Sequence, residues 1–480
     1  MHLEKAIAQG LTTEDKLDKA VVRQYSSLIR LGYFDPAEGQ PYRALGWSDV
    51  DKKSSRDLAY KAAVSGIALL KNDGMFPMYL KNGTSIALVG EWANATRQMQ
   101  GNYLGRPPYL ISPLMALEKE PGITVNYAYG IAGGGDPRTD EWKPALDAAQ
   151  NSDIIIYVGG IDNDQEAEGK DRTSIGWSPA QQDLIQHLAS MDKPMAVIQM
   201  GGGSVDSAFI RDDPRIAGLM WGGYPGQSGG QALVDVMLGR VAPAGRLTTT
   251  QYPAEYAKQV SMLDMGMRPS KTNPGRTYMW YSGAPTYPFG FGLHYTNFSA
   301  AVSLNTKTST NTFKIGKLIA ACDGHHPKPK WLDLCPFASL KVDVTNEGHK
   351  TTSDYSALAF ISGEYGPLPR PHKKLVSYAC LHDVAPGESK SAELKLTLNS
   401  LSRVDEQGRR VLYPGKYRIA IDTTPELAAV EFVLEGEEVI LDYYPIPDAK
   451  PEMTEEETET ETETAVSSVE MEQERLSLEL

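Results

Sequence analysis

The twenty residues "DIIIYVGGIDNDQEAEGKDR" (153–172) join an apolar run to a double glycine and then to a cluster of charged side chains. The stretch "DIIIYVGG" (153–160) contains a short, continuous apolar run, which predicts a strand buried on both faces of a sheet. Glycine at 159 and 160 permits a sharp exit from that strand. We therefore expect the charged cluster just beyond the carboxyl end of a buried strand. It comprises Glu166, Glu168, Asp171 and Arg172.

Similar apolar runs alternate with helical patterns on both sides of this stretch. A helix is predicted at 56–72, and others at 143–152, 179–191 and 228–239. Further strands are predicted at 85–90, 123–130, 194–200 and 216–221. Continuous apolar strands separated by amphipathic helices indicate a doubly wound α/β sandwich whose mainly parallel sheet is covered on both faces. In such sheets ligands bind beyond the carboxyl ends of the strands, where the charged cluster is expected.

The pattern changes after "YPFGFGLHYTNF" (287–298), where the helical period disappears. Short alternating runs separated by Asn, Pro and Gly turns follow, which predict a β-sandwich of roughly seven strands. Helices are predicted within 3–33 and a linker after them, and the segment "EEETETETET" (455–464) is expected to be disordered. The predicted segments are 1–54 for these helices and linker, 55–294 for the α/β sandwich, 295–446 for the β-sandwich and 447–480 for an acidic tail.

Charge and hydropathy exclude several classes of partner. The formal charge is −14, but the tail from 449 to 480 supplies eleven Glu against Lys450 and Arg475, so the rest of the chain is nearly balanced. No basic stripe for nucleic acid is expected. No apolar stretch reaches the roughly 18 residues of a membrane span. The opening residues contain no apolar region of the kind found in a secretory signal peptide, so none is expected in this chain.

The three cysteines do not form a zinc-binding pattern, because no CxxC pair is present. No metal site is therefore expected. Cys322 and Cys335 are close enough in sequence to close a short loop, which would leave Cys380 over; the pairing stays open. Three triplets fit acceptors for N-linked glycosylation. They begin at Asn82, Asn94 and Asn297.

Charged residues after a buried strand most often form a solvent-exposed turn with no catalytic role. A catalytic role for this cluster therefore needs further evidence. Arg172 can pair with one acid of the cluster while another stays free. Glycoside hydrolysis requires two carboxyl groups whose environments push their pKa values apart. Spacing alone does not establish such a role for Glu166 or Glu168.

Other conspicuous residues have a structural interpretation. The glycines at 201–203 lack the pattern of a phosphate-binding loop, Ser228 fits a helix cap, and His294 is expected to be structural. Aromatic side chains could stack on sugar rings, although aromatic residues in a core are commoner. They are Trp221, Tyr224, Trp280 and Tyr281.

Several motifs carry a resemblance to a known family. They include "LVGEWANATRQMQGNYLGRPPYLISPL" (88–114), "GGIDNDQEAEGKDRTSIGWSPAQQDLI" (159–185), "WGGYPGQSGGQAL" (221–233) and "APAGRLTTTQYP" (242–253). The chain resembles the fungal β-xylosidases of glycoside hydrolase family 3 from about residue 5 to about residue 442. The resemblance implies a TIM-type barrel, an α/β sandwich and a fibronectin type III-like domain. It also implies retaining hydrolysis of β-glycosidic bonds from the non-reducing end, without metal or organic cofactor.

The resemblance assigns roles to the charged cluster. The general acid/base of the family is a Glu in a Glu-Gly-x-Asp-Arg setting, which here is Glu168. Glu166 and Arg172 are further candidates for substrate binding. Asp171 and Arg172 are candidates for orienting the loop, although a structural ion pair explains these two at least as well. A general acid must protonate the leaving oxygen and then deprotonate the attacking water.

The chain departs from the family pattern before the α/β region. The family's nucleophile is an Asp in a Ser-Asp motif on a barrel of about 250 residues, whereas only some 45 residues precede the α/β pattern here. Those residues resemble the last barrel helices and the linker, and Asp49 of Trp47-Ser48-Asp49 falls in the linker. We expect a short helical remnant of the barrel and no nucleophile in this chain. The apolar faces of the remnant should then be exposed, at Val21, Val22, Leu28 and Ile29.

The resemblance implies an exo-acting xylan 1,4-β-xylosidase that releases xylose from xylo-oligosaccharides outside the cell, of which this chain would be a truncated form. A β-glucosidase or α-arabinofuranosidase of the same family is one alternative, and a non-catalytic carbohydrate-binding remnant is another. A β-glycoside is the expected partner, a dimer is left open, and neither nucleic acid nor a membrane is expected.

Overall fold

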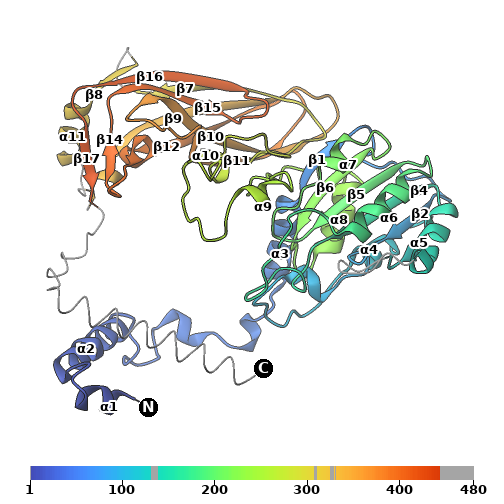
Figure 1. Cartoon of the computed structure of the whole chain (residues 1–480), viewed down its shortest axis with the longest axis horizontal. Helices are drawn as coiled ribbons and strands as arrows, with labels where there is room; N and C mark the ends of the chain where they lie inside the picture. Colours follow the sequence, from blue (N-terminus) through green and yellow to red (C-terminus); the bar gives the residue numbers. More distant parts are fainter. Residues whose placement is uncertain (1, 131–138, 307–310, 325–328, 330, 444–480) are drawn as a thin grey trace.

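The computed structural model describes residues 2–130, 139–306, 311–324, 329 and 331–443, so the predicted disorder of the acidic tail lies outside the described residues. Figure 1 shows a helix-covered sheet, an all-β unit beside it, and a pair of N-terminal helices that stand apart from both. This arrangement confirms the predicted fold class of an α/β unit followed by a β-sandwich.

The first sheet has six strands in the order β1-β6-β5-β4-β2-β3, and every neighbouring pair is parallel except β1 with β6. The strands are β1 (Ala68–Asn72), β2 (Ser85–Val89), β3 (Thr124–Ala128), β4 (Ile154–Gly160), β5 (Met195–Met200) and β6 (Gly218–Gly223). The predicted strand at 153–160 is β4, near the centre of the sheet.

Helices cover both faces of this sheet. Side chains of α3 (Lys53–Gly66), α4 (Pro113–Leu117) and α8 (Gly229–Met237) share one apolar cluster with Ile156 and Val158 of β4. Side chains of α5 (Thr139–Gln150), α6 (Pro179–Ala189) and α7 (Ala208–Asp212) share another with Ile155 and Tyr157. Successive residues of a strand point to opposite faces, so one continuous apolar strand supplies both clusters.

The helix predicted at 56–72 is wrong in its second half. α3 ends at Gly66, and the following residues form the edge strand β1, which pairs with β6 in the antiparallel direction. Ile67, Leu69 and Leu70 are buried there. A short apolar run fits a buried helix and a buried strand equally well, and the free edge of β6 decides between them by supplying backbone partners.

The second unit is a β-sandwich built mainly from two sheets of order β11-β10-β15-β16-β8 and β12-β9-β7. A smaller sheet, β13-β14-β17, lies beside them. Its strands are β7 (Phe298–Asn305), β8 (Thr312–Lys314), β9 (Pro336–Asn346), β10 (Ser353–Tyr365), β11 (Lys374–Val384), β12 (Ser389–Thr397), β13 (Arg403–Val404), β14 (Arg410–Leu412), β15 (Gly415–Ile421), β16 (Ala428–Glu435) and β17 (Val439–Asp442).

The sandwich also contains helices, contrary to the expectation that helical structure ends near residue 298. They are α11 (Ile315–Asp323) and α12 (Leu398–Leu401). Cys322 of α11 forms a disulfide with Cys335, and their Cα atoms are 5.6 Å apart. The disulfide ties α11 to the residue before β9, which settles the pairing and leaves Cys380 as the free cysteine. Because α11 is one short helix among strands, its period was easily missed.

The remaining short elements lie in the loops of the α/β unit and in the N-terminal segment. They are η1 (Pro41–Ala44), η2 (Trp47–Asp49), η3 (Arg97–Gln100), α9 (Tyr256–Gln259), α10 (Thr277–Trp280) and, in the sandwich, η4 (Leu332–Leu334). Of the helices in the described ranges, none has the length together with the apolar character that a bilayer crossing demands.

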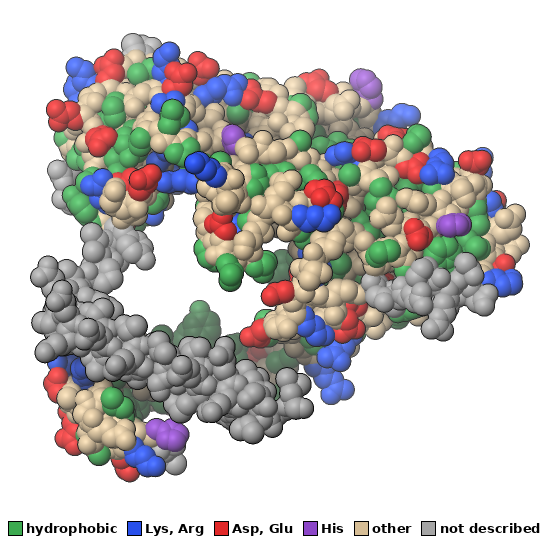
Figure 2. Space-filling view, in the orientation of Figure 1, with side chains coloured by type: hydrophobic (Ala, Val, Ile, Leu, Met, Phe, Trp, Pro, Cys, Tyr) green, Lys and Arg blue, Asp and Glu red, His purple; other side chains and the backbone are tan. Residues whose placement is uncertain are grey.

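The N-terminal helices α1 (Leu3–Ala8) and α2 (Glu14–Arg30) contain no buried residue. Val21, Val22 and Ile29 are exposed as predicted, while Leu28 is half-buried. In the space-filling view these helices project away from the two larger units (Figure 2). The apolar stripe of α2 therefore has no packing partner among the described residues of either unit.

A buried ion pair joins the two larger units. Arg246, from the loop after α8, contacts Asp422 at the end of β15 with 2.9 Å between nitrogen and oxygen, and both side chains are about nine-tenths buried. Tyr355 donates a hydrogen bond to the same carboxylate, and its ring lies beneath the Arg246 guanidinium. Desolvation by burial raises the pKa of Asp422. His294 stacks on Tyr355 at this junction, which confirms its structural placement.

Candidate functional site at the carboxyl edge of the sheet

The loop after β4 turns away from the sheet at Gly160. This residue has φ +138°, and a Cβ on it would lie 2.1 Å from the backbone oxygen of Met200, so only glycine fits. The loop then forms a tight turn in which Ala167 and Lys170 exchange backbone hydrogen bonds of 3.3 and 2.9 Å. Gly169 takes φ +72° within that turn. Glu168 consequently sits at the exposed tip of the loop.

Arg172 binds Glu166 and not Glu168. Its Nε donates to Glu166 Oε2 at 2.6 Å, and its Nη2 donates to the carbonyl oxygen of Ser204 at 3.0 Å. The arginine side chain is only 12% exposed. A Cβ at Gly203 would lie 2.5 Å from the Glu166 carboxylate, so the glycine run at 201–203 admits this ion pair. The pair pins the loop after β4 against the loop after β5.

Glu168 has a different partner, the hydroxyl of Tyr103, which donates a hydrogen bond to its carboxylate. This hydrogen bond raises the pKa of Tyr103. Tyr103 follows η3 in the loop after β2, and β2 pairs with β4 in the sheet. Two neighbouring strands thus deliver a phenol and a carboxylate to the same edge.

A polar pocket of about 640 Å³ opens beside these two loops. It is lined by Arg97, Gln98, Gly101, Asn102, Tyr103, Leu104, Asp162, Asn163, Asp164 and Ala167. Most of these side chains can donate or accept hydrogen bonds, which suits a ligand rich in hydroxyl groups. Glu168 adjoins the pocket through Tyr103 and Ala167, so an exposed carboxylate stands at the rim of a hydroxyl-compatible cavity.

The other charged candidates lie in different settings. Asp171 is exposed. Asp49 ends η2 in the segment before α3, where its carboxylate accepts the backbone N–H of Gly46 at 2.9 Å and contacts Lys52 at 2.5 Å. The hydrogen bond from Lys52, followed by that from Gly46, lowers the pKa of Asp49. These contacts make Asp49 part of a local turn.

Of the four aromatic candidates, Tyr224 contacts this site, because its hydroxyl is 3.4 Å from Asn163 Oδ1. Trp221 donates to the carbonyl oxygen of Gly201 at 3.1 Å. Trp280 lies under Arg268, and Tyr281 packs against Tyr252 and Tyr256. Sequence reasoning therefore named one aromatic neighbour of the pocket and missed Tyr103.

Ser228 corrects the expectation of a helix cap. It occupies the N-cap position of α8, but its side chain makes no capping hydrogen bond. Its Oγ lies 2.8 Å from the hydroxyl of Tyr109 instead. The hydroxyl thus links α8 to the loop before α4 rather than satisfying the helix terminus.

Comparisons with known proteins support the fold. Residues 67–295 match the glycosyl hydrolase family 3 C-terminal domain, and residues 356–424 match the fibronectin type III-like domain. A probable exo-1,4-beta-xylosidase of Aspergillus flavus is 45% identical over 446 residues, which are 92% of this chain and 55% of the relative. One from Neosartorya fischeri is 46% identical over 448 residues, 93% of this chain and 56% of the relative.

A solved structure of a family 3 exo-beta-xylosidase is also similar to this chain in three dimensions. The family 3 exo-beta-xylosidase in complex with a xylobiose aziridine activity-based probe superposes with a TM-score of 0.85 and 42% identity. The alignment covers 93% of this chain and 57% of that one. The chain spans about half the length of the curated relatives it matches. On this sequence and structural similarity, residues 67–295 form a glycosyl hydrolase family 3 C-terminal domain and residues 356–424 a fibronectin type III-like domain.

Proposed function

We propose that this chain carries the acid/base half of an exo-acting, retaining xylan 1,4-β-xylosidase, with Glu168 as the general acid/base. The observation that carries the proposal is the exposed Glu168 carboxylate, which stands at the rim of a polar pocket on the carboxyl edge of the sheet. The sequence relatives named above support xylo-oligosaccharides as the substrate class.

In the proposed reaction Glu168 first protonates the oxygen of the leaving sugar and afterwards removes a proton from the attacking water. Tyr103 positions the carboxylate through its hydrogen bond. The Glu166–Arg172 pair fixes the same loop from the other side, and Glu166, the more exposed partner, is proposed to contact sugar hydroxyls. Arg172 is largely buried, so we now assign it to the loop rather than to the substrate.

Retaining hydrolysis needs a second carboxyl group about 5 to 5.5 Å from the first. We propose that this nucleophile belongs to the part of the relatives that this chain does not match. Asp49 is an unsuitable candidate because its carboxylate is engaged by Gly46 and Lys52 in a turn before α3. The 480 residues by themselves are accordingly expected to bind sugar without hydrolysing it.

A fusion protein tests the role of Glu168. The part of the Aspergillus flavus relative that this chain does not match is joined to this chain, and kcat/KM is measured on xylobiose. Glu168→Gln is expected to lower it by about 100-fold to 10,000-fold. Nitrophenyl xyloside should lose far less in its first step, because its leaving group needs no proton.

Glu255→Gln is the matched control, since Glu255 is an exposed glutamate paired with Lys258. Equal losses on both substrates would contradict an acid/base role for Glu168. Turnover by the unfused 480-residue chain that disappears in Glu168→Gln would contradict the proposal that the nucleophile lies elsewhere.

Calorimetry on the unfused chain addresses the alternatives. The unfused chain is expected to bind xylobiose without hydrolysing it. If the fusion protein instead hydrolysed glucosides or arabinofuranosides faster than xylosides, a β-glucosidase or α-arabinofuranosidase would replace the xylosidase as the proposed activity. Sugar binding by the chain combined with an inactive fusion would favour the non-catalytic carbohydrate-binding alternative.

We also propose an extracellular, glycosylated protein. Asn82, Asn94 and Asn297 are exposed, which supports their role as acceptors. Mass spectrometry after enzymatic removal of N-linked glycans from the protein produced in a fungal host would show which sites are used.

The proposed domain boundaries are 54/55, 294/295 and 446/447. A dimer is also proposed for the native assembly.

A further inference from the structure

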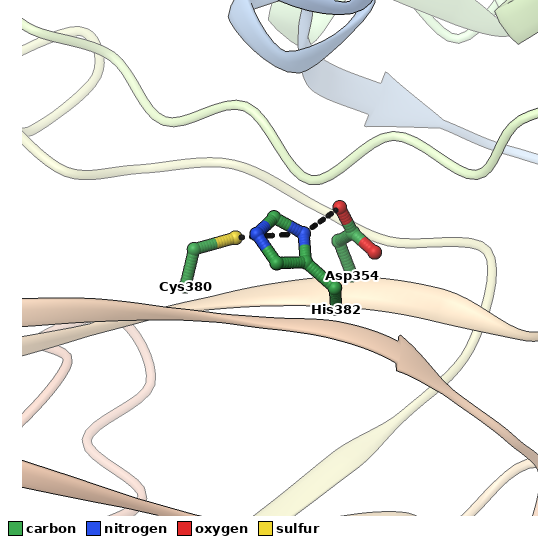
Figure 3. Close-up of side chains that lie close together, drawn as sticks. All are labelled: Asp354, Cys380 and His382. Atoms are coloured by element: carbon green, nitrogen blue, oxygen red, sulfur yellow. Dashed lines mark hydrogen bonds and ion pairs between the residues drawn. The ribbon is translucent and has the colours of Figure 1, made fainter.

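Three side chains of different donor type meet on the outer face of the sandwich (Figure 3). In the β10–β11 pair, Tyr355 lies opposite Leu381 and both are buried, while Ser356 lies opposite Cys380. Side chains alternate between faces along a strand. Cys380 and His382 therefore share the outer face of β11, and Asp354 meets them there from β10.

The donor atoms already lie close together. His382 Nδ1 is 2.7 Å from Asp354 Oδ2 and 3.7 Å from Cys380 Sγ. One donor atom of each residue falls within 4.8 Å of the others. A tetrahedral zinc ion with ordinary bond lengths separates sulfur from nitrogen by about 3.6 Å and nitrogen from oxygen by about 3.4 Å. Small side-chain rotations are enough to reach that geometry.

The backbone around the three residues is held in place by further contacts. The register shifts between Ser353 and Tyr355, and Asp383 opposite takes φ 54°. The N–H of Asp383 donates to Asp354 Oδ1 at 2.8 Å, which orients the carboxylate. Lys390 Nζ donates to the carbonyl oxygens of His382 and Asp383 at 2.7 and 2.9 Å. Groups that hold the ligands in this way strengthen metal binding.

We propose that Asp354, Cys380 and His382 form a zinc site with water as the fourth ligand. The thiolate and imidazole select zinc over magnesium or calcium, which prefer oxygen ligands. Binding releases the thiol proton to solvent. The imidazole binds through Nδ1 as the neutral tautomer with its proton on Nε2, and the carboxylate exchanges its hydrogen bond for a bond to the metal. His382 is 49% exposed, so solvent reaches the fourth position.

The site lies at the edge of a pocket of about 720 Å³ between the two large units. Asp354 and Asp383 line this pocket from the sandwich, and Tyr60 and Lys61 of α3 line it from the α/β unit. A zinc-bound water would therefore face the junction of the units. The proposal is independent of the glycosidase function, since these residues belong to other elements than the loops that carry Glu168 and Tyr103.

Cys380 is a convenient reporter, because the other two of the three cysteines form the disulfide. The full chain is titrated with ZnCl₂ in a non-chelating buffer, and the rate of thiol labelling by a disulfide reagent is measured. Zinc is expected to slow labelling by about tenfold or more, and Asp354→Asn and His382→Ala should each weaken this protection by about tenfold. Cobalt(II) in place of zinc should give a thiolate charge-transfer absorption that Cys380→Ser abolishes.

His349→Ala is the matched control, because His349 is an exposed histidine of the same unit. It should keep full protection, and circular dichroism verifies that each variant is folded. An unchanged labelling rate with zinc would overturn the proposal. Protection as strong as that of the wild type in both Asp354→Asn and His382→Ala would also overturn it, because the thiol would then bind zinc alone. A loss of protection in His349→Ala would do the same.

Discussion

Tyr103 adopts φ 52°, in the left-handed region that bulky side chains rarely enter, and its hydroxyl donates to the Glu168 carboxylate. Backbone conformations of this kind persist where surrounding contacts impose them, and they concentrate at functional sites. The tyrosine was not found from sequence because its motif, "GNYLG" (101–105), gives no indication that the loops after β2 and β4 meet. Pairing of those two strands brings the residues together.

Tyr103→Phe in the fusion protein removes the donor and keeps the ring. We expect kcat on xylobiose to fall severalfold with little change in KM, because the hydrogen bond positions a proton-transfer group rather than the sugar. Tyr79→Phe is the control, since Tyr79 is 86% exposed. A rise in KM at constant kcat would identify Tyr103 as a sugar-binding residue instead.

His294 predicts a pH dependence of stability. Burial, and secondarily the charge of Arg246, lowers its pKa to about 3, while Asp422 and Tyr355 are the other titratable groups at this junction. The folded state keeps the imidazole neutral, whereas the unfolded chain protonates it below about 6.5. The contribution of His294 to the free energy of unfolding should therefore fall as pH falls from about 6.5 toward 3, by about 2 kcal/mol between pH 7 and pH 5.

The histidine's share of that loss is measured by urea unfolding of the wild type and His294→Phe at both pH values. The phenyl ring keeps the contacts with Tyr355 and Phe298 but does not titrate. The variant should lose about 2 kcal/mol less than the wild type over this interval. Parallel pH profiles for the two proteins would show that His294 does not carry the effect.

At the scale of elements, Gly160 controls how β4 ends and where the acid/base loop begins. Its φ of +138° and the 2.1 Å approach to the Met200 oxygen leave no room for a Cβ. Gly160→Ala is expected to lower the free energy of unfolding by about 3 kcal/mol or more, because the clash involves backbone of the neighbouring strand β5.

Gly105→Ala serves as the comparison, since a Cβ there would meet nothing within 4 Å. Urea denaturation should find this variant within about 0.5 kcal/mol of the wild type. If Gly160→Ala were equally mild, the strand exit would have to rearrange easily, and the loop geometry described here would not be enforced by β5.

The alternation of apolar runs with helical patterns made the doubly wound sheet predictable. Strand β4 and its charged loop were predicted from "DIIIYVGG" and the residues after it. Elements decided by a partner strand were not predictable. The residues after Gly66 become β1 only because β6 has a free edge. Likewise Asp354 meets Cys380 and His382 through the β10–β11 register, across a separation that no local motif such as CxxC reports.

At the scale of the whole molecule, the two large units hold each other through a buried network, while α2 does not join them. Arg246, Asp422 and Tyr355 connect the sheet-bearing unit to the sandwich. Along α2, by contrast, apolar side chains such as Val22 and Ile29 are exposed. Contiguous exposed apolar surface of this kind commonly marks an interface. Because the relatives contain roughly as much again of unmatched chain, we infer that this stripe packs against that part.

The double variant Val22→Asp/Ile29→Asp tests this inference, because both side chains are 63% exposed. In the unfused chain the free energy of unfolding should be unchanged, since neither residue is buried. In the fusion protein the same two charges would enter an apolar interface, at a cost of several kcal/mol, so activity on xylobiose and resistance to trypsin near α2 should both fall. Arg23 lies between the two residues in sequence and is not part of the apolar stripe. Arg23→Asp, which also introduces negative charge, should leave both activity and trypsin resistance near the wild-type values. Loss of stability in the unfused chain would mean that α2 already packs on the α/β unit or the sandwich, and full activity of the fused double variant would place the interface elsewhere.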